Sequence, residues 1–251
     1  MIKKILVTIL ILCTFMCMPI TSLAECRSWY IKRNGTNPPT PPADIEMIKE
    51  CGGFYLNDHL GDGEKKLYLT FDAGYENGNI ERILDVLKNE KVPAAFFVLD
   101  NLIIKNSDLV IRMADEGHLV CNHTKRHKNL SEASEEEIRR DLTALEDIYR
   151  EYTGREMAKY FRFPEGKYSQ HALSCVAKMG YKTAFWSFAY EDWDNNKQPR
   201  GDYAKKKILS NTHNGAVILL HPTSKTNADI LSELISEWRS MGYEFGTLDE
   251  I

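Results

Sequence analysis

Short apolar runs rich in β-branched and aromatic residues alternate with amphipathic helical runs from Lys66 to the end of the chain. The expected strands are 67–71, 94–98, 118–121, 160–163, 183–186 and 216–220. The expected helices are 79–90, 107–116, 134–152, 169–179, 203–211 and 228–241. Parallel strands need a connection of helical length, so this alternation indicates βαβ units. Repeated about seven times, such units predict an α/β domain, residues 66–251, folded as a distorted barrel.

The segment before this domain, residues 25–65, lacks the alternation. Its run of prolines, 37–42, suits neither a helix nor a central strand, because proline has no N–H to donate. Residues 44–51 can form a short helix, which Gly52 and Gly53 end. We expect an irregular extension that packs beside the main domain.

Residues 1–24 have the pattern of a secretory signal peptide. Lys3 and Lys4 precede an uncharged apolar run, 5–20, and Ala24 lies where a signal peptidase reads a small residue. The alternative is an uncleaved N-terminal anchor, although the run is short for a membrane span of about 20 residues. Both alternatives predict a protein exported across the membrane, secreted or anchored on its outer side.

Charge and cysteine content limit the partners and the compartment. The formal net charge is −4, which argues against nucleic acid or another polyanion as a partner. Cys26 and Cys51 flank one N-terminal segment and could pair in an oxidising compartment. Cys121 and Cys175 lie in apolar runs, where we expect them to be buried as small apolar side chains.

Polar residues follow several of the expected strands. Catalytic groups of parallel α/β barrels cluster at the carboxyl ends of strands, so these positions are candidates for a site. Asp72 leaves a strand and enters a glycine-rich turn, where a carboxylate can act as a general base or bind a metal. His221 follows a buried strand and is placed for proton transfer. Taken singly, each is equally well explained as a turn aspartate or a structural histidine.

Three further segments carry suitable side chains. His123 and His127 are four residues apart, so on a helical turn both rings would face one divalent cation; two surface histidines are the alternative. Arg162 ends a strand and could hold a carboxylate in a fixed fork, or lie on the surface. Asp192 precedes Trp193, and a carboxylate beside an aromatic face suits a sugar site.

In this order and spacing, the five segments resemble the polysaccharide deacetylases of the NodB-homology family, carbohydrate esterase family 4. The resemblance covers about residues 66–251 and implies a barrel of about seven strands. The form of several motifs is closer to the spore-cortex muramic-acid de-N-acetylases, also called δ-lactam-biosynthetic deacetylases. These motifs are Tyr75-Glu76-Asn77-Gly78, Glu116-Gly117-His118 and Phe185-Trp186-Ser187.

The resemblance implies a role for each catalytic candidate. Asp72 matches the general base that deprotonates the attacking water, and Arg162 matches the arginine that orients this base. His221 matches the general acid that protonates the departing amine. Asp192 matches the aspartate that tunes this histidine.

The resemblance also implies a cofactor and a substrate pocket. His123 and His127 match the two metal-binding histidines, so a divalent metal, with zinc the first candidate, is expected. Trp193 and Leu219 match residues of the apolar pocket for the acetyl methyl group. Ala73 is a departure, because most of the family has there an aspartate that binds the metal. Two neutral ligands hold Zn²⁺ more weakly than two histidines and a carboxylate.

The resemblance implies hydrolytic de-N-acetylation of N-acetylmuramic acid in peptidoglycan, leading to muramic-δ-lactam in the spore cortex. An amidase would first remove the stem peptide from the glycan strand. One alternative keeps the reaction on N-acetylglucosamine in peptidoglycan or chitin, or on an O-acetyl ester of xylan. Another is a catalytically dead protein that binds wall glycan, but a binder has no need of proton-transfer groups. The oligomeric state is open.

Overall fold

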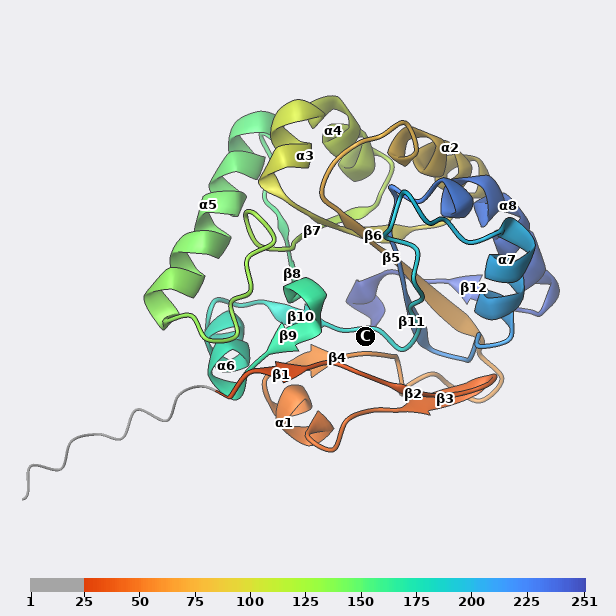
Figure 1. The fold of residues 1–251 in the computed structure, drawn as a ribbon, viewed down its shortest axis with the longest axis horizontal. Helices are drawn as coiled ribbons and strands as arrows, with labels where there is room; N and C mark the ends of the chain where they lie inside the picture. Colours follow the sequence, from red (N-terminus) through yellow and green to blue (C-terminus); the bar gives the residue numbers. More distant parts are fainter. Residues whose placement is uncertain (1–24) are drawn as a thin grey trace, which may run out of the picture.

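Seven parallel strands form the curved main sheet of this computed structural model, which describes residues 25–251 (Figure 1). Their order is β11-β5-β6-β7-β8-β10-β4, and β12 (Glu244–Phe245) pairs with β5 beside this path. The seven are β4 (Gly53–Phe54), β5 (Lys66–Ala73), β6 (Ala94–Val98), β7 (Leu119–Asn122), β8 (Ala158–Phe161), β10 (Lys182–Ala184) and β11 (Ala216–Leu220).

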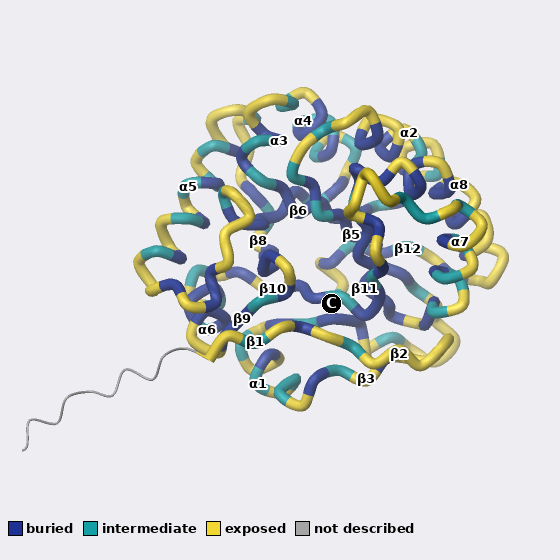
Figure 2. The backbone as a smooth tube through the Cα atoms, in the orientation of Figure 1, coloured by how far each residue is buried: buried dark blue, intermediate teal, exposed yellow. Residues whose placement is uncertain are grey.

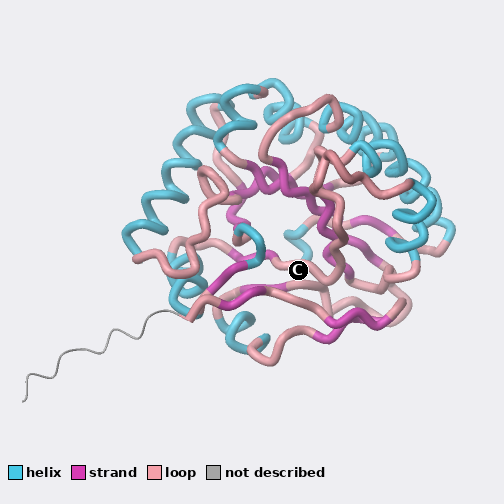
Figure 3. Tube along the Cα trace, in the orientation of Figure 1, coloured by secondary structure: helices cyan, strands magenta, loops and turns pink. Residues whose placement is uncertain are grey.

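Helices surround this sheet on its outer side (Figure 3). They are α2 (Ile80–Glu90), α3 (Asp100–Lys105), α4 (Ser107–Asp115), α5 (Glu135–Thr153), α6 (Gln170–Lys178), α7 (Gly201–Leu209) and α8 (Lys225–Ser240). All six expected strands and six expected helices are present, with ends displaced by a few residues. The short helix α3 was not predicted.

The two edges of the sheet meet through isolated bridges. Leu56, just after β4, forms an antiparallel bridge with Ala216, and Phe188 forms a parallel bridge with Ile218. Single residue pairs, and not a full strand, therefore close the ring. The predicted distorted α/β barrel is confirmed.

Residues of β5 alternate between two cores. Leu67, Leu69 and Phe71 belong to the large core between the sheet and the outer helices. Tyr68 belongs to a small core inside the ring, to which η2 (Leu248–Glu250) contributes Leu248. In Figure 2 the central strands are mostly dark blue, the colour of buried residues. A strand covered on both faces reads as an almost continuous apolar run, which is why β5 was recognisable.

The segment 25–65 is more regular than predicted. β1 (Arg27–Ser28) pairs with β9 (Lys167–Tyr168), and β2 (Lys32–Asn34) pairs with β3 (Asn37–Thr40). After α1 (Ile45–Glu50), β4 joins the main sheet beside β10. Pro38 and Pro39 lie in this two-stranded ribbon, where a missing N–H is tolerated, and Pro41 and Pro42 follow it. The extension packs beside the main domain, as predicted, and contacts distant in sequence order its short elements.

A disulfide between Cys26 and Cys51 does not form, since all four described cysteines are free. The Cys26 sulfur accepts a hydrogen bond from the Ser131 hydroxyl at 3.0 Å, whereas Cys51 ends α1. Cys121 and Cys175 are buried, as predicted.

The expected leader, residues 1–24, lies outside the described residues, and its cleavage or anchoring stays a prediction. Within residues 25–251, no helix combines the length and the apolar character that a membrane span requires.

Leu248 offers a test of the inner core. Its side chain is 1% exposed among buried residues of six strands. We expect Leu248→Ala to lower the free energy of unfolding by about 2–5 kcal/mol, because the methyl groups that are removed leave a cavity. Urea denaturation measures this, with Ile104→Ala as the control at a 44% exposed position, where the expected change is about 0.5 kcal/mol. Equal effects of both substitutions would contradict the assignment of the inner core.

Candidate active site

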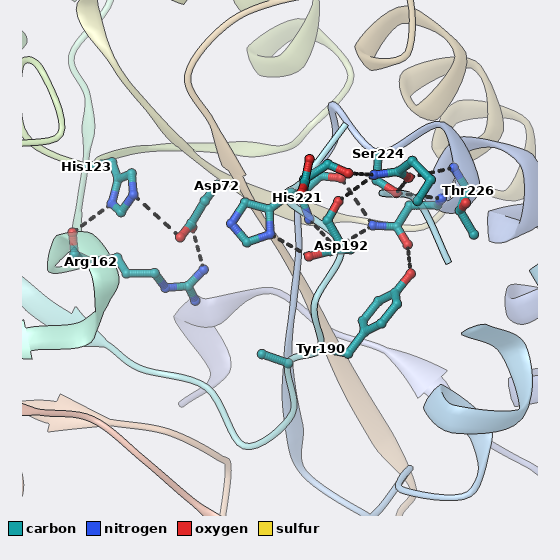
Figure 4. A network of polar contacts seen from close by, with 12 residues as sticks. Asp72, His123, Arg162, Tyr190, Asp192, His221, Ser224 and Thr226 are labelled. Carbon is teal, nitrogen blue, oxygen red and sulfur yellow. Dashed lines mark hydrogen bonds and ion pairs between the residues drawn. The ribbon is translucent and has the colours of Figure 1, made fainter. Parts of the chain in front are cut away.

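The register of the parallel strands brings the first candidates together. Leu220 at the end of β11 lies opposite Phe71 of β5, so the next residues, His221 just after β11 and Asp72 near the end of β5, lie at the same level. Figure 4 shows Asp72 between His221 and His123, which follows β7. The structure therefore brings together three side chains that lie far apart in sequence.

Arg162 is fully buried directly after β8 and is bonded on every side. Nη1 donates to Asp72 Oδ1 at 2.8 Å, Nη2 to Thr70 Oγ1 at 2.9 Å, and Nε to the Ala184 carbonyl at 2.9 Å. The guanidinium also lies over the Phe97 ring, 4.1 Å from its centroid. The surface alternative for this arginine is excluded.

The charge on Asp72 follows from these contacts. Burial by itself raises the pKa of the Asp72 carboxyl, but the positive charge of Arg162 and the neighbouring imidazoles outweigh it and hold the pKa below its usual range. The carboxylate is thus ionised over the whole neutral range and has one oxygen, Oδ2, free of the arginine bond.

His123 is fixed in one tautomer. Its Nδ1 lies 2.9 Å from the Arg162 carbonyl, which can only accept, so Nδ1 carries the proton and Nε2 the lone pair. Burial lowers the pKa of His123 to about 4, which keeps the ring neutral. Nε2 points toward Asp72 Oδ2, 3.5 Å away. Two electron-rich atoms that face each other suit a cation or a donor hydrogen between them.

His127 reaches its neighbour by a route that the sequence spacing does not predict. Thr124 and His127 have positive φ angles of 68° and 56°, so the segment is a tight loop, and the expected helical turn is wrong. The His123 and His127 rings still lie face to edge, with centroids 5.0 Å apart. His123 is buried, whereas His127 is exposed to solvent.

The two imidazoles are the protein ligands available to a metal. Within residues 25–251, no cluster of three His, Cys, Asp or Glu side chains could hold an ion. Ala73 is fully buried in the outer core and provides no donor. The donor set fits a divalent cation bound by two neutral nitrogens, which is fewer protein ligands than a closed zinc site has.

His221 is paired with a buried carboxylate. Its Nδ1 lies 2.7 Å from Asp192 Oδ1, and its backbone N–H donates to Asp192 Oδ2 at 2.8 Å. Burial by itself lowers the pKa of His221, but the Asp192 carboxylate outweighs it and raises the pKa above 6.5. The Asp192 carboxylate therefore favours the protonated form of the ring.

The two residues expected to line the acetyl pocket lie next to this pair. Trp193 is 56% exposed, and its ring stands edge-on to His221 with centroids 6.1 Å apart. Leu219 is buried on β11 opposite Thr70, two residues before His221. Sequence reasoning missed two residues. Asn227 donates a hydrogen bond to Asp192, and Tyr190 donates one to Asn227. A buried asparagine in the first turn of α8 was the available signal.

Two surface hollows adjoin the site. One, of about 500 Å³, is lined by Gly74, Tyr75 and Arg126 among others, and the second, of about 340 Å³, by Trp193 and Tyr203. A larger hollow of about 750 Å³ lies between α2 and α4 and contains none of the candidate residues. Chemistry, and not size, therefore identifies the site.

The charge on His221 can be tested directly. We expect Asp192→Asn to lower the pKa of His221 below 6.5, because burial then acts without an opposing carboxylate. In the wild type, protonated His221 stabilises the fold below pH 6.5, and this contribution fades as pH rises through its raised pKa. NMR titration of the histidine ring protons measures the shift, with exposed Asp194→Asn as the control. An unchanged titration in Asp192→Asn would refute the pairing.

Comparison with known proteins agrees with this geometry. Residues 60–184 match the polysaccharide deacetylase family. The chain is 42% identical to an uncharacterized 30.6 kDa protein of Geobacillus stearothermophilus, over 88% of this chain and 82% of that one. It is 35% identical to the peptidoglycan-N-acetylmuramic acid deacetylase PdaA of Bacillus subtilis, over 89% and 85%.

Solved structures show the same similarity. The structure of Bacillus subtilis PdaA, a family 4 carbohydrate esterase, has a TM-score of 0.85 and covers 90% of this chain and 96% of that one. A family 4 carbohydrate esterase from Bacillus anthracis, 37% identical, has a TM-score of 0.74 over 90% and 95%. The chain therefore belongs to the polysaccharide deacetylases, the enzymes of carbohydrate esterase family 4 with the NodB-homology fold.

Proposed function

We propose that this enzyme hydrolyses the N-acetyl group of N-acetylmuramic acid in peptidoglycan. The observation that carries the proposal is a base and an acid, each held in its working charge state, on adjacent strands. Arg162 keeps Asp72 ionised, while Asp192 keeps His221 protonated at the same pH. The relative named as a muramic acid deacetylase, matched over 85% of its length, supports the choice of sugar.

The proposed reaction uses these two groups in sequence. Asp72 takes a proton from a water molecule as the water oxygen bonds to the acetyl carbonyl carbon. The carbon–nitrogen bond then breaks, and His221 gives its proton to the departing nitrogen. The products are acetate and a free amine on the sugar. Arg162 holds Asp72 in place through both steps.

The proposed cofactor is a divalent cation, with zinc as the first candidate, held by Nε2 of His123 and by His127. When bound, such an ion polarises the acetyl carbonyl and stabilises its developing negative charge. Trp193 and Leu219 would enclose the acetyl methyl group beside His221. Binding would be favourable there, because the methyl group and the apolar side chains leave contact with water.

The proposed biological context is the spore cortex. The freed amine lies on the sugar that carries the lactyl carboxylate, and closure of the two releases water and forms muramic-δ-lactam. In peptidoglycan the stem peptide is joined to that carboxylate by an amide bond, so an amidase must act first. The partner of the protein is the glycan strand. Peptidoglycan lies outside the membrane, in agreement with the expected export signal, whether the protein is secreted or anchored.

Substitution of the base and the acid tests the mechanism. We expect Asp72→Asn and His221→Ala each to lower kcat by about 10²- to 10⁴-fold, because each removes one proton transfer. Mass spectrometry of the deacetylated glycan measures the rate. Exposed Asp62→Asn and His59→Ala are the matched controls and keep wild-type activity. Wild-type rates in Asp72→Asn and His221→Ala would refute these two roles. No acetyl loss with the wild-type protein would favour a glycan-binding protein.

The substrate is tested on peptidoglycan with and without prior amidase treatment. We expect loss of one acetyl group from each muramic acid only after the amidase has removed the stem peptide. Product masses with and without added zinc show the effect of the metal in the same experiment. Acetyl loss from glucosamine alone would reject muramic acid as the substrate and support the N-acetylglucosamine alternative.

A further inference from the structure

Asn227 lies behind the candidate acid and belongs to none of the groups described above as reacting. It is the third residue of α8 and is 1% exposed. Its side-chain N–H groups donate to Asp192 Oδ2 at 2.6 Å and to the His221 carbonyl at 3.1 Å. One amide therefore contacts both members of the Asp192–His221 pair.

Asp192 depends on this contact for its attachment to the scaffold. Its carboxylate accepts two other hydrogen bonds among the described residues, and both come from His221, through Nδ1 at 2.7 Å and the backbone N–H at 2.8 Å. Both of these bonds anchor the carboxylate to one residue, directly after β11. Asn227 supplies the remaining bond, from a different helix, and ties the Asp192 side chain to α8.

Tyr190 fixes the orientation of the Asn227 amide. The Tyr190 hydroxyl donates to Asn227 Oδ1, and both groups are buried (Figure 4). The two atoms facing Nδ2 are a carboxylate oxygen and a carbonyl oxygen, which only accept hydrogen bonds. A flipped amide would bring oxygen against oxygen at both positions, so a single orientation satisfies all three partners.

The first turn of α8 is itself held in place. Ser224 caps the helix by accepting from the Asn227 backbone N–H at 3.2 Å, and its hydroxyl donates to Gln198 Oε1 at 2.6 Å. Gln198 in turn donates to the Asp192 carbonyl at 3.0 Å. The backbone and the side chain of Asp192 are thus fixed by two separate paths that meet at the start of α8.

We propose that Asn227, oriented by Tyr190, is a positioning residue that holds the Asp192 carboxylate against Nδ1 of His221. The inference rests on the proposed function in one respect only, the use of His221 as the proton donor. The other charged groups acting on His221 are Asp72 on β5 and Arg162 after β8. Neither forms a hydrogen bond with Asn227 in the described chain. A change at position 227 therefore reaches the His221 ring through Asp192, and the His221 backbone through its carbonyl.

Asn227→Leu tests the proposal, because leucine has a similar size and cannot hold the carboxylate. We expect Asp192 to turn away, the pKa of His221 to fall, and the alkaline limb of the kcat/KM profile to move to lower pH. We expect kcat to fall about 10- to 100-fold with little change in KM, since only the orientation of a catalytic group is lost. Tyr190→Phe, which keeps Asn227 but frees its amide, should give a smaller shift in the same direction.

Asn211→Leu is the matched control. Asn211 donates to the Lys207 carbonyl at 2.8 Å at the other end of β11, away from His221. It should leave the pH profile unchanged. If Asn227→Leu does not fold, Tyr190→Phe decides the result alone. An unchanged His221 titration with lower thermal stability would overturn the proposal, and so would a rise in the His221 pKa, which would mean that Asn227 merely withdraws charge from Asp192.

NMR titration of His221 in the free protein separates this proposal from the function above. The titration needs no substrate, so it reports positioning even if His221→Ala retains activity. The expected fall of the His221 pKa in Asn227→Leu, together with an active His221→Ala variant, would support the positioning role and reject His221 as the proton donor.

Discussion

The buried guanidinium of Arg162 is the group on which the candidate site depends. Removing one partner from a buried ion pair costs about 3–5 kcal/mol, because the remaining charge stays in a medium that solvates it poorly. Here the positive charge is matched by Asp72 and its other N–H groups bond to Thr70 and Ala184. These partners come from β5 and β10, while the residue itself follows β8. One side chain thus fixes the upper end of the ring and the charge state of the base.

The pKa values of two histidines in the same site, His123 and His221, are shifted in opposite directions, and the contacts of each ring explain the difference. Burial favours the neutral form of both rings. Burial lowers the pKa of His123 to about 4, and neither the Arg162 carbonyl at Nδ1 nor the Asp72 carboxylate 3.5 Å from Nε2 offsets this. His221 binds a buried carboxylate, and its pKa rises. The two histidines of this site therefore have pKa values shifted in opposite directions.

The sequence predicted those features that follow from strand patterning and register. Asp72 and His221 were identified because each follows an apolar strand, and parallel pairing then makes them neighbours. The loop of His127 was not predicted, because its left-handed residues depend on packing around β7 and not on local preference. Closure through Leu56, and the role of Asn227, likewise require contacts between segments more than 30 residues apart along the chain.

Ala73 shows how packing limits the chemistry of this chain. Alternation along β5 turns Asp72 toward the site and Ala73 into the apolar layer under the outer helices, where it is fully buried. A carboxylate there would have to leave that layer to reach His123. Asp72 would be the anionic group nearest to a divalent ion on His123, since Asp72 Oδ2 lies 3.5 Å from His123 Nε2. With Ala73 in place of a carboxylate, two imidazoles would hold such an ion more weakly than a site with a third protein ligand.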